Sequence, residues 1–577
     1  MGKGFTLSKK SEEVARSRYF MNGENWESCT QRASNVLASC EMNRQSKIRD
    51  SFFDIMVSQY FIPGGRILRN AGRPRGSLFN CYHLPVGDSI DEIGQFIKDS
   101  LILWSEGGGV GCNFSSLRPK GDAILGKGGS SSGLVSFIEA ADAVSHTIES
   151  GGSRRAAAIA HVDINHPEVM DFIDSKLVHG RLAHFNISVS VNEDFLQRVE
   201  QDGEWTFKFK QKKYGTVKAR DLWNKIVKNM IECGEPGLIN WTNFAKNNSY
   251  YFSPVLGTNP CGETTLGPYE SCDLGSLVLP NFITSGNINT NWEKLKEVVK
   301  IAVRFLDNVI DVNKYALKDI DINAHKSRRI GIGVIGLAEY LFMKKVRYGS
   351  EQAIRHTEAV MRAIRDAAYQ ASIELAVEKG AFPMFDPVQY GKASFIRKLP
   401  AELRMDIKKY GVRNCTVMAL APTGTISLLT NYSSAIEPVF SKALKRHDRI
   451  SERIYIHPKY EELLKTGDPI PDWFVDSYDL EAADHFAIQA ACQRFCDGAV
   501  SKTINLPAET TEEELSSLLL EYIRDLKGVT VYRDGCREGQ ILTKLSNEEI
   551  MESITQNKTD NDIREVAVEC ASGSCEI

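Results

Sequence analysis

The chain has 577 residues, of which 42% are hydrophobic and 25% are charged. Such values are typical of a soluble globular protein with a large core, and the length allows several domains, although barrel folds reach about 250 residues as one unit. The formal net charge is −4, and arginine and lysine are scattered along the chain. This argues against a nucleic-acid polymer as partner and leaves nucleotides as candidate small ligands.

The cysteines indicate the cellular compartment of the protein. The thirteen cysteines follow no regular framework, and neither an apolar N-terminal signal region nor a run of 18 apolar residues occurs. Reduced thiols without a leader or a membrane span are typical of an intracellular protein. We therefore expect a cytoplasmic protein that does not enter a membrane.

Three regions follow one another along the chain. Residues 1–60 are polar with a helical pattern, and their candidate core residues are Trp26, Val36, Leu37 and Ile48. Residues 61–545 alternate short apolar runs (187–191 and 417–421) with amphipathic stretches (295–313 and 352–378), which predicts an α/β fold with parallel strands. Residues 546–577 turn polar, and we expect a mobile tail that ends with Cys570 and Cys575.

The most informative segment lies in the middle of the chain. Asn259-Pro260-Cys261-Gly262-Glu263 puts an amide, a thiol and a carboxylate at alternate positions. On an extended segment these three side chains would project to the same side. Such a finger could present a hydrogen-bonding amide, a redox-capable sulfur and a general base to one polyol ligand. The alternative is an inert buried cysteine in a tight turn with a solvated glutamate.

Seven stretches together resemble the catalytic subunits of ribonucleotide reductases, in family order from about Phe61 to about Leu542. The stretches are Phe79–Val86, Gly107–Gly111 continuing to Leu117–Gly121, Gly151–Arg155, Asn259–Glu263 with Ser271–Ser276, Ala421–Ser427, Ala499–Pro507 and Val529–Gly535. The resemblance implies a ten-stranded α/β barrel built from two half-barrels, with the cysteine finger threaded through its centre. The N-terminal region shows no match to the regulatory ATP-cone of the family.

The resemblance also implies the chemistry. Cys261 would carry a thiyl radical that takes a hydrogen atom from C3′ of the ribose, Glu263 would act as base on the 3′-hydroxyl, and Asn259 would hold the ribose hydroxyls. Cys81 and Cys272 match the pair that supplies two electrons and ends as a disulfide, provided that the fold brings them within disulfide reach. They could instead be two unrelated core cysteines.

The two tail cysteines match the family's redox shuttle. Cys570 and Cys575 would reduce the buried disulfide by exchange and would then be reset by a thioredoxin- or glutaredoxin-like reductant. A lone pair at this spacing could also be a weak zinc site, but no second ligand pair accompanies it. We expect no metal site in this chain.

Substrate and effector sites are implied at two further places. The substrate would bind at Asn80 and at a small-residue loop that could cradle phosphates or be an ordinary turn: Thr423, Gly424, Thr425, Ile426 and Ser427. The family's usual Ser or Thr near Pro63 is replaced by Gly64-Gly65-Arg66, so Arg66 or backbone amides would substitute.

An allosteric nucleotide would bind at a homodimer interface. The residues that match the family's effector site are Asp88, Ser89, Ile90 and Arg118, together with Arg154 and Arg155 on a glycine-containing loop. A solvated basic turn is the alternative for that loop.

The radical source is predicted from one tyrosine. Oxygen-dependent family members carry two adjacent tyrosines near the end of the barrel, whereas Thr530–Gly535 contains only Tyr532. This segment resembles that of the adenosylcobalamin-dependent type, so we expect that cofactor. We expect diphosphate substrates, and the replacement near Pro63 leaves triphosphates as the alternative. The alternatives are an oxygen-dependent large subunit with a radical-generating partner and a non-catalytic nucleotide-binding regulator.

Two further motifs favour other functions only weakly. Gly331–Gly336 spells G-x-G-x-x-G, which would suit a dinucleotide-dependent dehydrogenase, but the arginines before it make a poor buried strand. We interpret these glycines as sites of close helix packing. Cys492 and Cys496 lack metal-ligating neighbours in the sequence and are predicted to be core residues.

Overall fold

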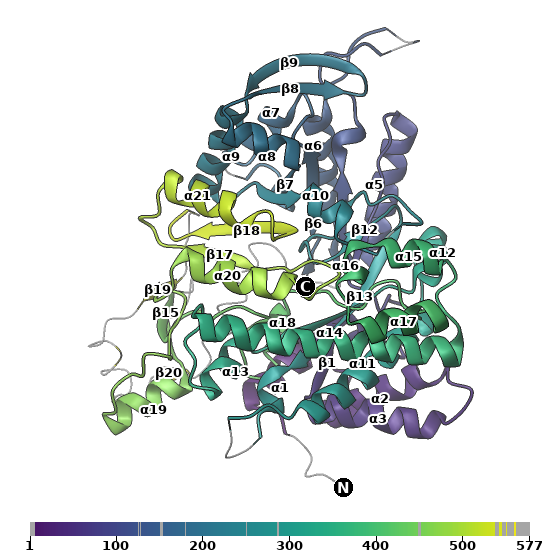
Figure 1. Cartoon of the computed structure of the whole chain (residues 1–577), viewed down its shortest axis with the longest axis vertical. Coiled ribbons are helices and arrows are strands. Elements are labelled where there is room, and N and C mark those ends of the chain that lie inside the picture. The colour runs from purple at the N-terminus through teal and green to yellow at the C-terminus, as the bar shows by residue number, and fades with distance from the viewer. Residues whose placement is uncertain are drawn as a thin grey trace.

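The computed structural model describes residues 6–536, except positions 125, 127, 151–153, 179, 250, 285–287 and 448–451, and beyond them residues 542–544, 550 and 559–560. The N-terminal region is helical, and its helices α1 (Lys9–Arg18), α2 (Trp26–Ala38) and α3 (Gln45–Val57) lie at the bottom of Figure 1. Asn25 caps α2 by accepting a hydrogen bond from Ser28 N, so the helix begins where the polar residue precedes the apolar Trp26. Trp26 and Leu37 are buried as predicted, and Val36 and Ile48 are partly buried.

Five parallel strands form the first half of a barrel. Their order is that of the chain, and each is hydrogen-bonded to the next: β2 (Cys81–His83), β3 (Gly109–Asn113), β6 (Ala158–Asp163), β7 (Phe185–Val191) and β10 (Gly237–Asn240). The predicted run 187–191 thus lies within β7. Most residues of β3, β6, β7 and β10 are buried, as expected for parallel strands covered on both faces.

The second half contains the remaining barrel strands. Within it β13 (Glu270–Val278) is parallel to β14 (Ile330–Ile335), and β17 (Thr503–Leu506) is parallel to β18 (Gly528–Arg533). Residues 417–421, predicted as a strand, form isolated parallel bridges instead: Ile332 with Met418 and Leu420 with Val500. These bridges connect β14 to the residues just before β17.

Two antiparallel seams join the halves. One seam pairs β10 with β18, and the other pairs β13 with β2, while β1 (Phe61–Pro63) extends the second seam along β13. With the bridges through 417–421 the sheet therefore returns on itself, which leaves its main strands without an open edge. The predicted barrel of two half-barrels is confirmed.

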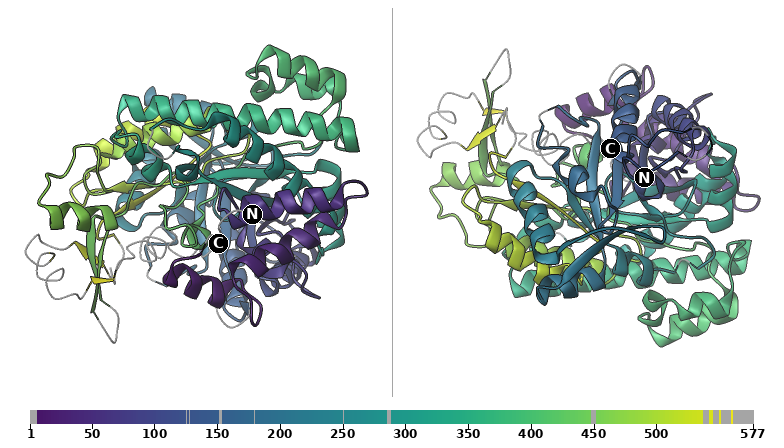
Figure 2. Two further views of the ribbon diagram at one scale, coloured as in Figure 1. Left: turned by 90° about the horizontal axis from the view of Figure 1, so that it is seen from below. Right: turned by 90° about the horizontal axis from the view of Figure 1, so that it is seen from above.

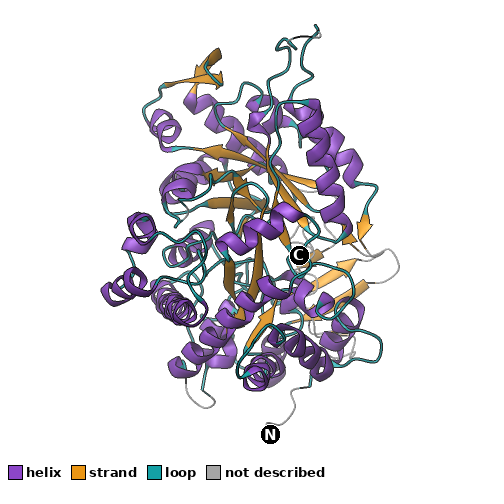
Figure 3. Ribbon diagram, turned by 90° about the vertical axis from the view of Figure 1, so that its right-hand side faces the viewer, coloured by secondary structure: helices purple, strands orange, loops and turns teal. Residues whose placement is uncertain are grey.

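Helices surround the strands, as Figure 3 shows. The predicted stretches 295–313 and 352–378 correspond to α11 (Trp292–Val312) and α14 (Glu351–Lys379). The other helices of the barrel region are α4 (Gly65–Asn70), α5 (Ile90–Ser105), α6 (Leu134–Ser145), α7 (Val169–Asp174), α8 (Glu193–Glu200), α9 (Ala219–Cys233), α10 (Trp241–Lys246), α12 (Lys318–Ser327), α13 (Leu337–Met343), α20 (Ala482–Gln493) and α21 (Glu512–Tyr522).

Smaller elements project from this body. The hairpin of β8 (Glu204–Phe209) and β9 (Lys212–Lys218) lies at the top of Figure 1. Figure 2 shows two groups at opposite edges of the molecule. One is helical: α15 (Pro387–Lys392), α16 (Ser394–Arg397) and α17 (Ala401–Tyr410). The other combines α19 (Pro458–Thr466) with a sheet of β15 (Ala443–His447), β16 (Glu452–Ile456), β19 (Leu542–Lys544) and β20 (Thr559–Asp560).

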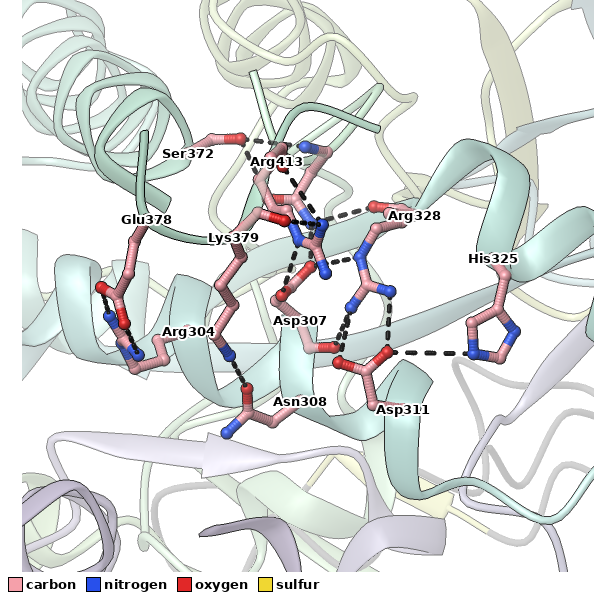
Figure 4. Close-up of polar contacts among 12 residues, drawn as sticks. Arg304, Asp307, Asn308, Asp311, His325, Arg328, Ser372, Glu378, Lys379 and Arg413 are labelled. Carbon is pink, nitrogen blue, oxygen red and sulfur yellow. Dashed lines mark hydrogen bonds and ion pairs between the residues drawn. The ribbon is translucent and has the colours of Figure 1, made fainter. Parts of the chain in front are cut away.

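A buried ion network anchors β14 from outside the barrel (Figure 4). Asp307 of α11 is fully buried and accepts hydrogen bonds from Arg328 Nε (2.8 Å), Arg413 Nε (3.1 Å) and Asn414 Nδ2 (3.0 Å). Burial alone would raise the pKa of Asp307, but the two guanidiniums outweigh it and hold the pKa below its ordinary value. Arg328 also pairs with Asp311 at 2.7 Å, so the chain entering β14 is fixed on both sides.

Gly331 and Gly333 belong to this strand, which corrects our expectation, and Gly336 follows it at the N-cap of α13. Every residue of β14 is buried, and the preceding arginines do not prevent a strand because Arg328 is neutralised by the network. A Cβ on Gly331 would lie 2.8 Å from Ala419 Cβ and 3.2 Å from Cys272 Sγ. Gly331 and Gly333 therefore permit close packing of strand on strand, whereas Gly336, with a φ of +77°, begins helix α13.

Candidate active site

The segment around Cys261 is a hairpin inside the barrel. Strands β11 (Gly257–Thr258) and β12 (Thr265–Leu266) pair antiparallel, and Gly262 N donates to Asn259 O at 3.0 Å. Gly262 has a φ of +81°, which favours glycine at this position of the turn. The expectation of an extended segment was wrong, because a tight turn spans Asn259–Gly262. The turn leaves Cys261 half-exposed near its tip, while Asn259 and Glu263 are buried.

Two glycines of the Gly107–Gly111 stretch make room for this hairpin. A Cβ on Gly111 would lie 1.8 Å from Thr258 O, and a Cβ on Gly109 would lie 2.8 Å from Pro260 Cγ. On the opposite wall, Ala499 N donates to Glu263 O at 2.7 Å. The hairpin is thus held between β3 and the segment that precedes β17.

Asn259 and Glu263 present unsatisfied polar groups. Asn259 Oδ1 accepts from Thr264 N (3.1 Å) and Thr264 Oγ1 (2.7 Å), whereas Asn259 Nδ2 and both Glu263 carboxylate oxygens make no hydrogen bond to any described residue. Complete burial raises the pKa of Glu263 to about 7, although the nearby Asn259 amide offsets part of the rise. A carboxyl group with such a pKa can take up and release a proton near neutral pH.

The fold brings Cys81 and Cys272 together. They are direct partners in the antiparallel pairing of β2 with β13, which places their Cα atoms at a separation that a disulfide can bridge. Both cysteines are buried. Burial raises the pKa of the Cys272 thiol well above its ordinary value, the neighbouring Asp273 adds to the rise, and Arg329 opposes it. Cys272 is therefore held as a neutral thiol close to Glu263.

A broad pocket opens beside Cys261. Its empty space is about 1290 Å³, counting the open mouth, and its lining comes from β7, β10, β17, β18 and the hairpin. The lining includes Cys261, Tyr532 and Lys502, but neither Cys81 nor Cys272. Lys502 is buried and donates to Glu437 Oε2 at 2.5 Å, so the pocket wall carries a neutralised ion pair.

The expected phosphate loop lies between this pocket and a smaller one. Residues Gly424–Ser427 form a single helical turn, α18, after Thr423, whose φ is +56°. Thr423 Oγ1 accepts a hydrogen bond from Ala435 N at 2.7 Å, and Ser427 Oγ donates to Gly424 O at 2.8 Å. Gly424 lines the larger pocket and Thr425 the smaller one, together with Asn80. Ile426 is instead part of a hydrophobic cluster.

The expected effector residues lie apart from the hairpin. Arg118 Nε pairs with Asp88 at 3.0 Å, and Ser89 caps α5, which starts at Ile90. Ile90 is 71% exposed. Arg154 and Arg155 form β5 (Arg154–Arg155), which pairs with β4 (Glu149–Ser150).

The remaining expectations concern the tail cysteines, the pair Cys492 and Cys496, metal ligands and membrane spans. Cys570 and Cys575 lie outside the described residues. Cys492 and Cys496 are core residues, as predicted. Among the described residues no cluster of three or more potential metal ligands occurs, and no helix is long and apolar enough to cross a membrane.

Sequence reasoning missed two buried histidines beneath the hairpin. A Cβ on Gly257 would lie 2.6 Å from His83 Nε2 and 3.2 Å from His161 Nδ1. Burial lowers the pKa of each imidazole to about 3, so both are neutral. The period of two along β2 could have indicated His83, because it faces the same side as Cys81.

Comparisons with known proteins agree with this architecture. The family model described as "Ribonucleotide reductase, barrel domain" matches residues 79–532, and "Ribonucleotide reductase, all-alpha domain" matches residues 5–76. A relative named vitamin B12-dependent ribonucleoside-diphosphate reductase, from Thermoplasma acidophilum, is 35% identical over 88% of this chain and 68% of its own length. A protein of the same name from Mycobacterium tuberculosis is 33% identical over 99% of this chain and 84% of its own length.

A more distant relative is the ribonucleoside-diphosphate reductase subunit alpha of Chlamydia muridarum, which is 27% identical over 72% of this chain and 45% of its own length. The barrel-domain model alone covers well over half of the sequence. With the barrel and its central cysteine hairpin in place, the chain belongs to the ribonucleotide reductase family.

Proposed function

We propose that this chain reduces ribonucleoside diphosphates to 2′-deoxyribonucleotides with a radical generated from adenosylcobalamin. The observation that carries the proposal is the pairing of Cys81 with Cys272, close to a hairpin that bears Cys261 and a carboxyl group poised near neutral pH. The names of the relatives from T. acidophilum and M. tuberculosis support the diphosphate substrate and the cofactor.

Three residues of the hairpin would have different roles in the reaction. The Cys261 radical would take the hydrogen atom from C3′, and Glu263 would remove the proton of the 3′-hydroxyl. The amide of Asn259 would donate to the ribose oxygens, since its Nδ2 has no partner among the described residues while its Oδ1 is fixed by Thr264. Pre-placed groups of this kind lower the barrier because they need not reorganise during the reaction.

The reducing pair would supply the two electrons that removal of the 2′-hydroxyl requires. The 2′-hydroxyl leaves as water, the Cys81 and Cys272 thiols give up two electrons and two hydrogens in total, and a disulfide forms between their sulfur atoms. The C3′ hydrogen then returns from Cys261, which regenerates the thiyl radical. Because both cysteines are buried, a separate thiol system must reduce this disulfide; we propose the tail cysteines Cys570 and Cys575 and a thioredoxin- or glutaredoxin-like protein.

The pocket beside Cys261 is where a cofactor would reach the thiol. It opens to solvent, its lining includes strand residues of β10 and β18, and it contains Cys261 but neither cysteine of the reducing pair. Leu238, Ile239, Phe244, Val531 and Tyr532 would hold the cofactor there. When bound, adenosylcobalamin would supply the radical that oxidises the Cys261 thiol. The substrate would then occupy the opposite side, near Asn80 and Thr425.

The remaining parts of the proposal concern regulation. We propose that the chain forms a homodimer in the cytoplasm and that (d)NTP effectors bind near Asp88, Ser89, Ile90, Arg118, Arg154 and Arg155. The match of Asp88, Ser89, Ile90 and Arg118 to the family's effector residues supports this place.

An anaerobic assay tests the function. CDP, dithiothreitol and an effector nucleotide are incubated with the protein, with and without adenosylcobalamin, and dCDP is measured. Product that depends on the cofactor is expected, and Cys261→Ser should abolish it. Product without the cofactor, formed only when a cell extract supplies a second subunit, would instead favour the oxygen-dependent type. A regulator without activity would bind nucleotides equally well with Cys261→Ser.

A further inference from the structure

A buried arginine lies next to one of the two cysteines of the reducing pair. Ile330, the first residue of β14, pairs with Asp273 in parallel register. One step earlier on both segments, this register sets Arg329 beside Cys272. Because β13 lies between β2 and β14, Arg329 is one strand away from Cys272 and two strands away from Cys81. Each step between neighbouring strands is about 4.8 Å.

The side chain of Arg329 shares a face of the sheet with Cys272. A Cβ on Gly331 would lie 3.2 Å from Cys272 Sγ, and Arg329 precedes Gly331 by two residues. Arg329 is 3% exposed, and its guanidinium is held by two donated hydrogen bonds. Nη2 donates to Glu270 Oε2 at 3.3 Å, and Nη1 donates to Thr416 Oγ1 at 3.2 Å. Its positive charge is therefore fixed close to Cys272.

The surroundings of Cys81 are different. On its other side β2 pairs with β3, where the direct partner of Cys81 is Gly109, which has no side chain. His83 follows Cys81 by two residues and shares its face. Burial lowers the pKa of this imidazole to about 3, so it is neutral. The two sulfur atoms are thus unequal, because the positive charge of Arg329 lies nearer to Cys272.

This inequality acts on the reduction of the disulfide. A nearby guanidinium stabilises a thiolate relative to a thiol. Burial raises the pKa of the Cys272 thiol, and Arg329 opposes the rise. When a disulfide is reduced by exchange, one of its sulfur atoms leaves as a thiolate, and the sulfur whose thiolate is better stabilised leaves faster.

We propose that Arg329 makes Cys272 the leaving group when the disulfide of the reducing pair is reduced, so that the attacking thiolate bonds to Sγ of Cys81. This proposal rests on the proposed function, in which Cys81 and Cys272 form a disulfide.

The exchange balances with a dithiol as reductant. One thiolate of the dithiol bonds to Cys81 Sγ, the bond between Cys81 and Cys272 breaks, and its electron pair stays on Cys272 Sγ beside Arg329. The second thiolate of the dithiol then attacks its own sulfur in the mixed disulfide and releases Cys81 as a thiolate. The two protons that the dithiol gives up restore the Cys81 and Cys272 thiols. The dithiol is oxidised to a disulfide, and the pair gains two electrons.

Trapping of the mixed disulfide tests the proposal without turnover. The pair is oxidised with diamide in a full-length variant with Cys570→Ser and Cys575→Ser, which prevents exchange by the tail. The monothiol 2-mercaptoethanol is added, and N-ethylmaleimide stops the reaction early. Peptide mass spectrometry should find mercaptoethanol on Cys81 and maleimide on Cys272, at least tenfold more often than the reverse. The reverse product in equal or larger amount would overturn the proposal.

Variants test the part played by the charge. Arg329→Gln should slow the formation of the Cys81 adduct at least tenfold, and Arg329→Lys should recover part of the loss because it restores a positive charge. Arg365→Gln is the matched control, since Arg365 is a buried arginine of α14 that pairs with its neighbour Asp366. It should keep the rate within threefold. A rate within threefold of the parent in Arg329→Gln would also overturn the proposal.

The outcomes separate this proposal from the function. If diamide forms no disulfide between Cys81 and Cys272, the pair itself is wrong, and the proposal falls with it. If the Cys81 adduct forms as expected but the wild-type protein makes no dCDP with adenosylcobalamin, the order of attack stands and the reductase function fails. Thermal unfolding of Arg329→Gln identifies a folding defect, and in that case the adduct ratio of the parent carries the test.

Discussion

Gly111→Ala should displace the hairpin that carries Cys261. A Cβ at this position would lie 1.8 Å from Thr258 O, and contacts below 3.0 Å essentially never occur. The nearest atom belongs to the backbone, so no side-chain rotation can relieve the clash. The hairpin or β3 must therefore shift by more than 1 Å.

A shift of this size has a known consequence for catalysis. Misplacing a reacting group by 1 Å can lower the rate about 100-fold, because the near-attack geometry is lost. We expect kcat for dCDP formation to fall at least 100-fold in Gly111→Ala. The Kd for CDP should rise less than kcat falls, since Asn80 and Thr425 lie outside the hairpin while Asn259 moves with it. Overpacking of the barrel should also cost about 1–3 kcal/mol of unfolding free energy.

Gly391→Ala provides the control. Gly391 lies in α15 at the edge of the molecule, and a Cβ there would meet no atom within 4 Å (Figure 2). This variant should keep full activity and stability. If Gly111→Ala retained kcat within threefold of the wild type, the hairpin would not be fixed by its contact with β3, and the reasoning from this geometry would be refuted.

Three further results are expected. Because burial raises the pKa of Glu263 to about 7, kcat should rise with pH through about 7 and then level off. Glu263→Gln should remove this rise of kcat with pH and lower kcat about 10²–10⁴-fold. An unchanged pH profile in the variant would show that another group is the base. Asp307→Ala leaves the buried Arg328 without one of its two carboxylates. The free energy of unfolding, measured in urea, should therefore fall by about 3–5 kcal/mol. A decrease below about 1 kcal/mol would contradict the anchoring role. One anaerobic turnover without reductant should remove two free thiols from the wild type and none from Cys81→Ser or Cys272→Ser; loss of two thiols in either variant would mean that the pair is wrongly assigned.

The helices were predictable because each carries its own periodic signal. Apolar residues that return every three or four positions bury one face, and α11 and α14 start and end within three residues of the predicted stretches. The glycine-rich strand β14 was not predictable in the same way. The arginines before it argued against a buried strand, and only the packing showed that Asp307 and Asp311 neutralise Arg328.

The active-site residues, too, were predictable only in part. The Asn259–Glu263 segment and its resemblance to a family indicated the chemistry, but the segment was expected to be extended. In the structure it is a turn, because the hairpin must reverse inside the barrel, and Gly262 adopts the positive φ that this reversal requires. Which side chains are buried follows from that turn and not from their spacing.

The sequence by itself determined the family, the alternation of helices and strands and the identity of the reactive groups, because each is encoded within a short stretch of chain. Only the tertiary structure decided that Cys81 faces Cys272, that burial raises the pKa of Glu263, and that Arg329 lies beside Cys272. These features depend on contacts between segments far apart in the chain and on the exclusion of water between them. Neither is encoded locally, since desolvation and register are set by the packing of the whole barrel.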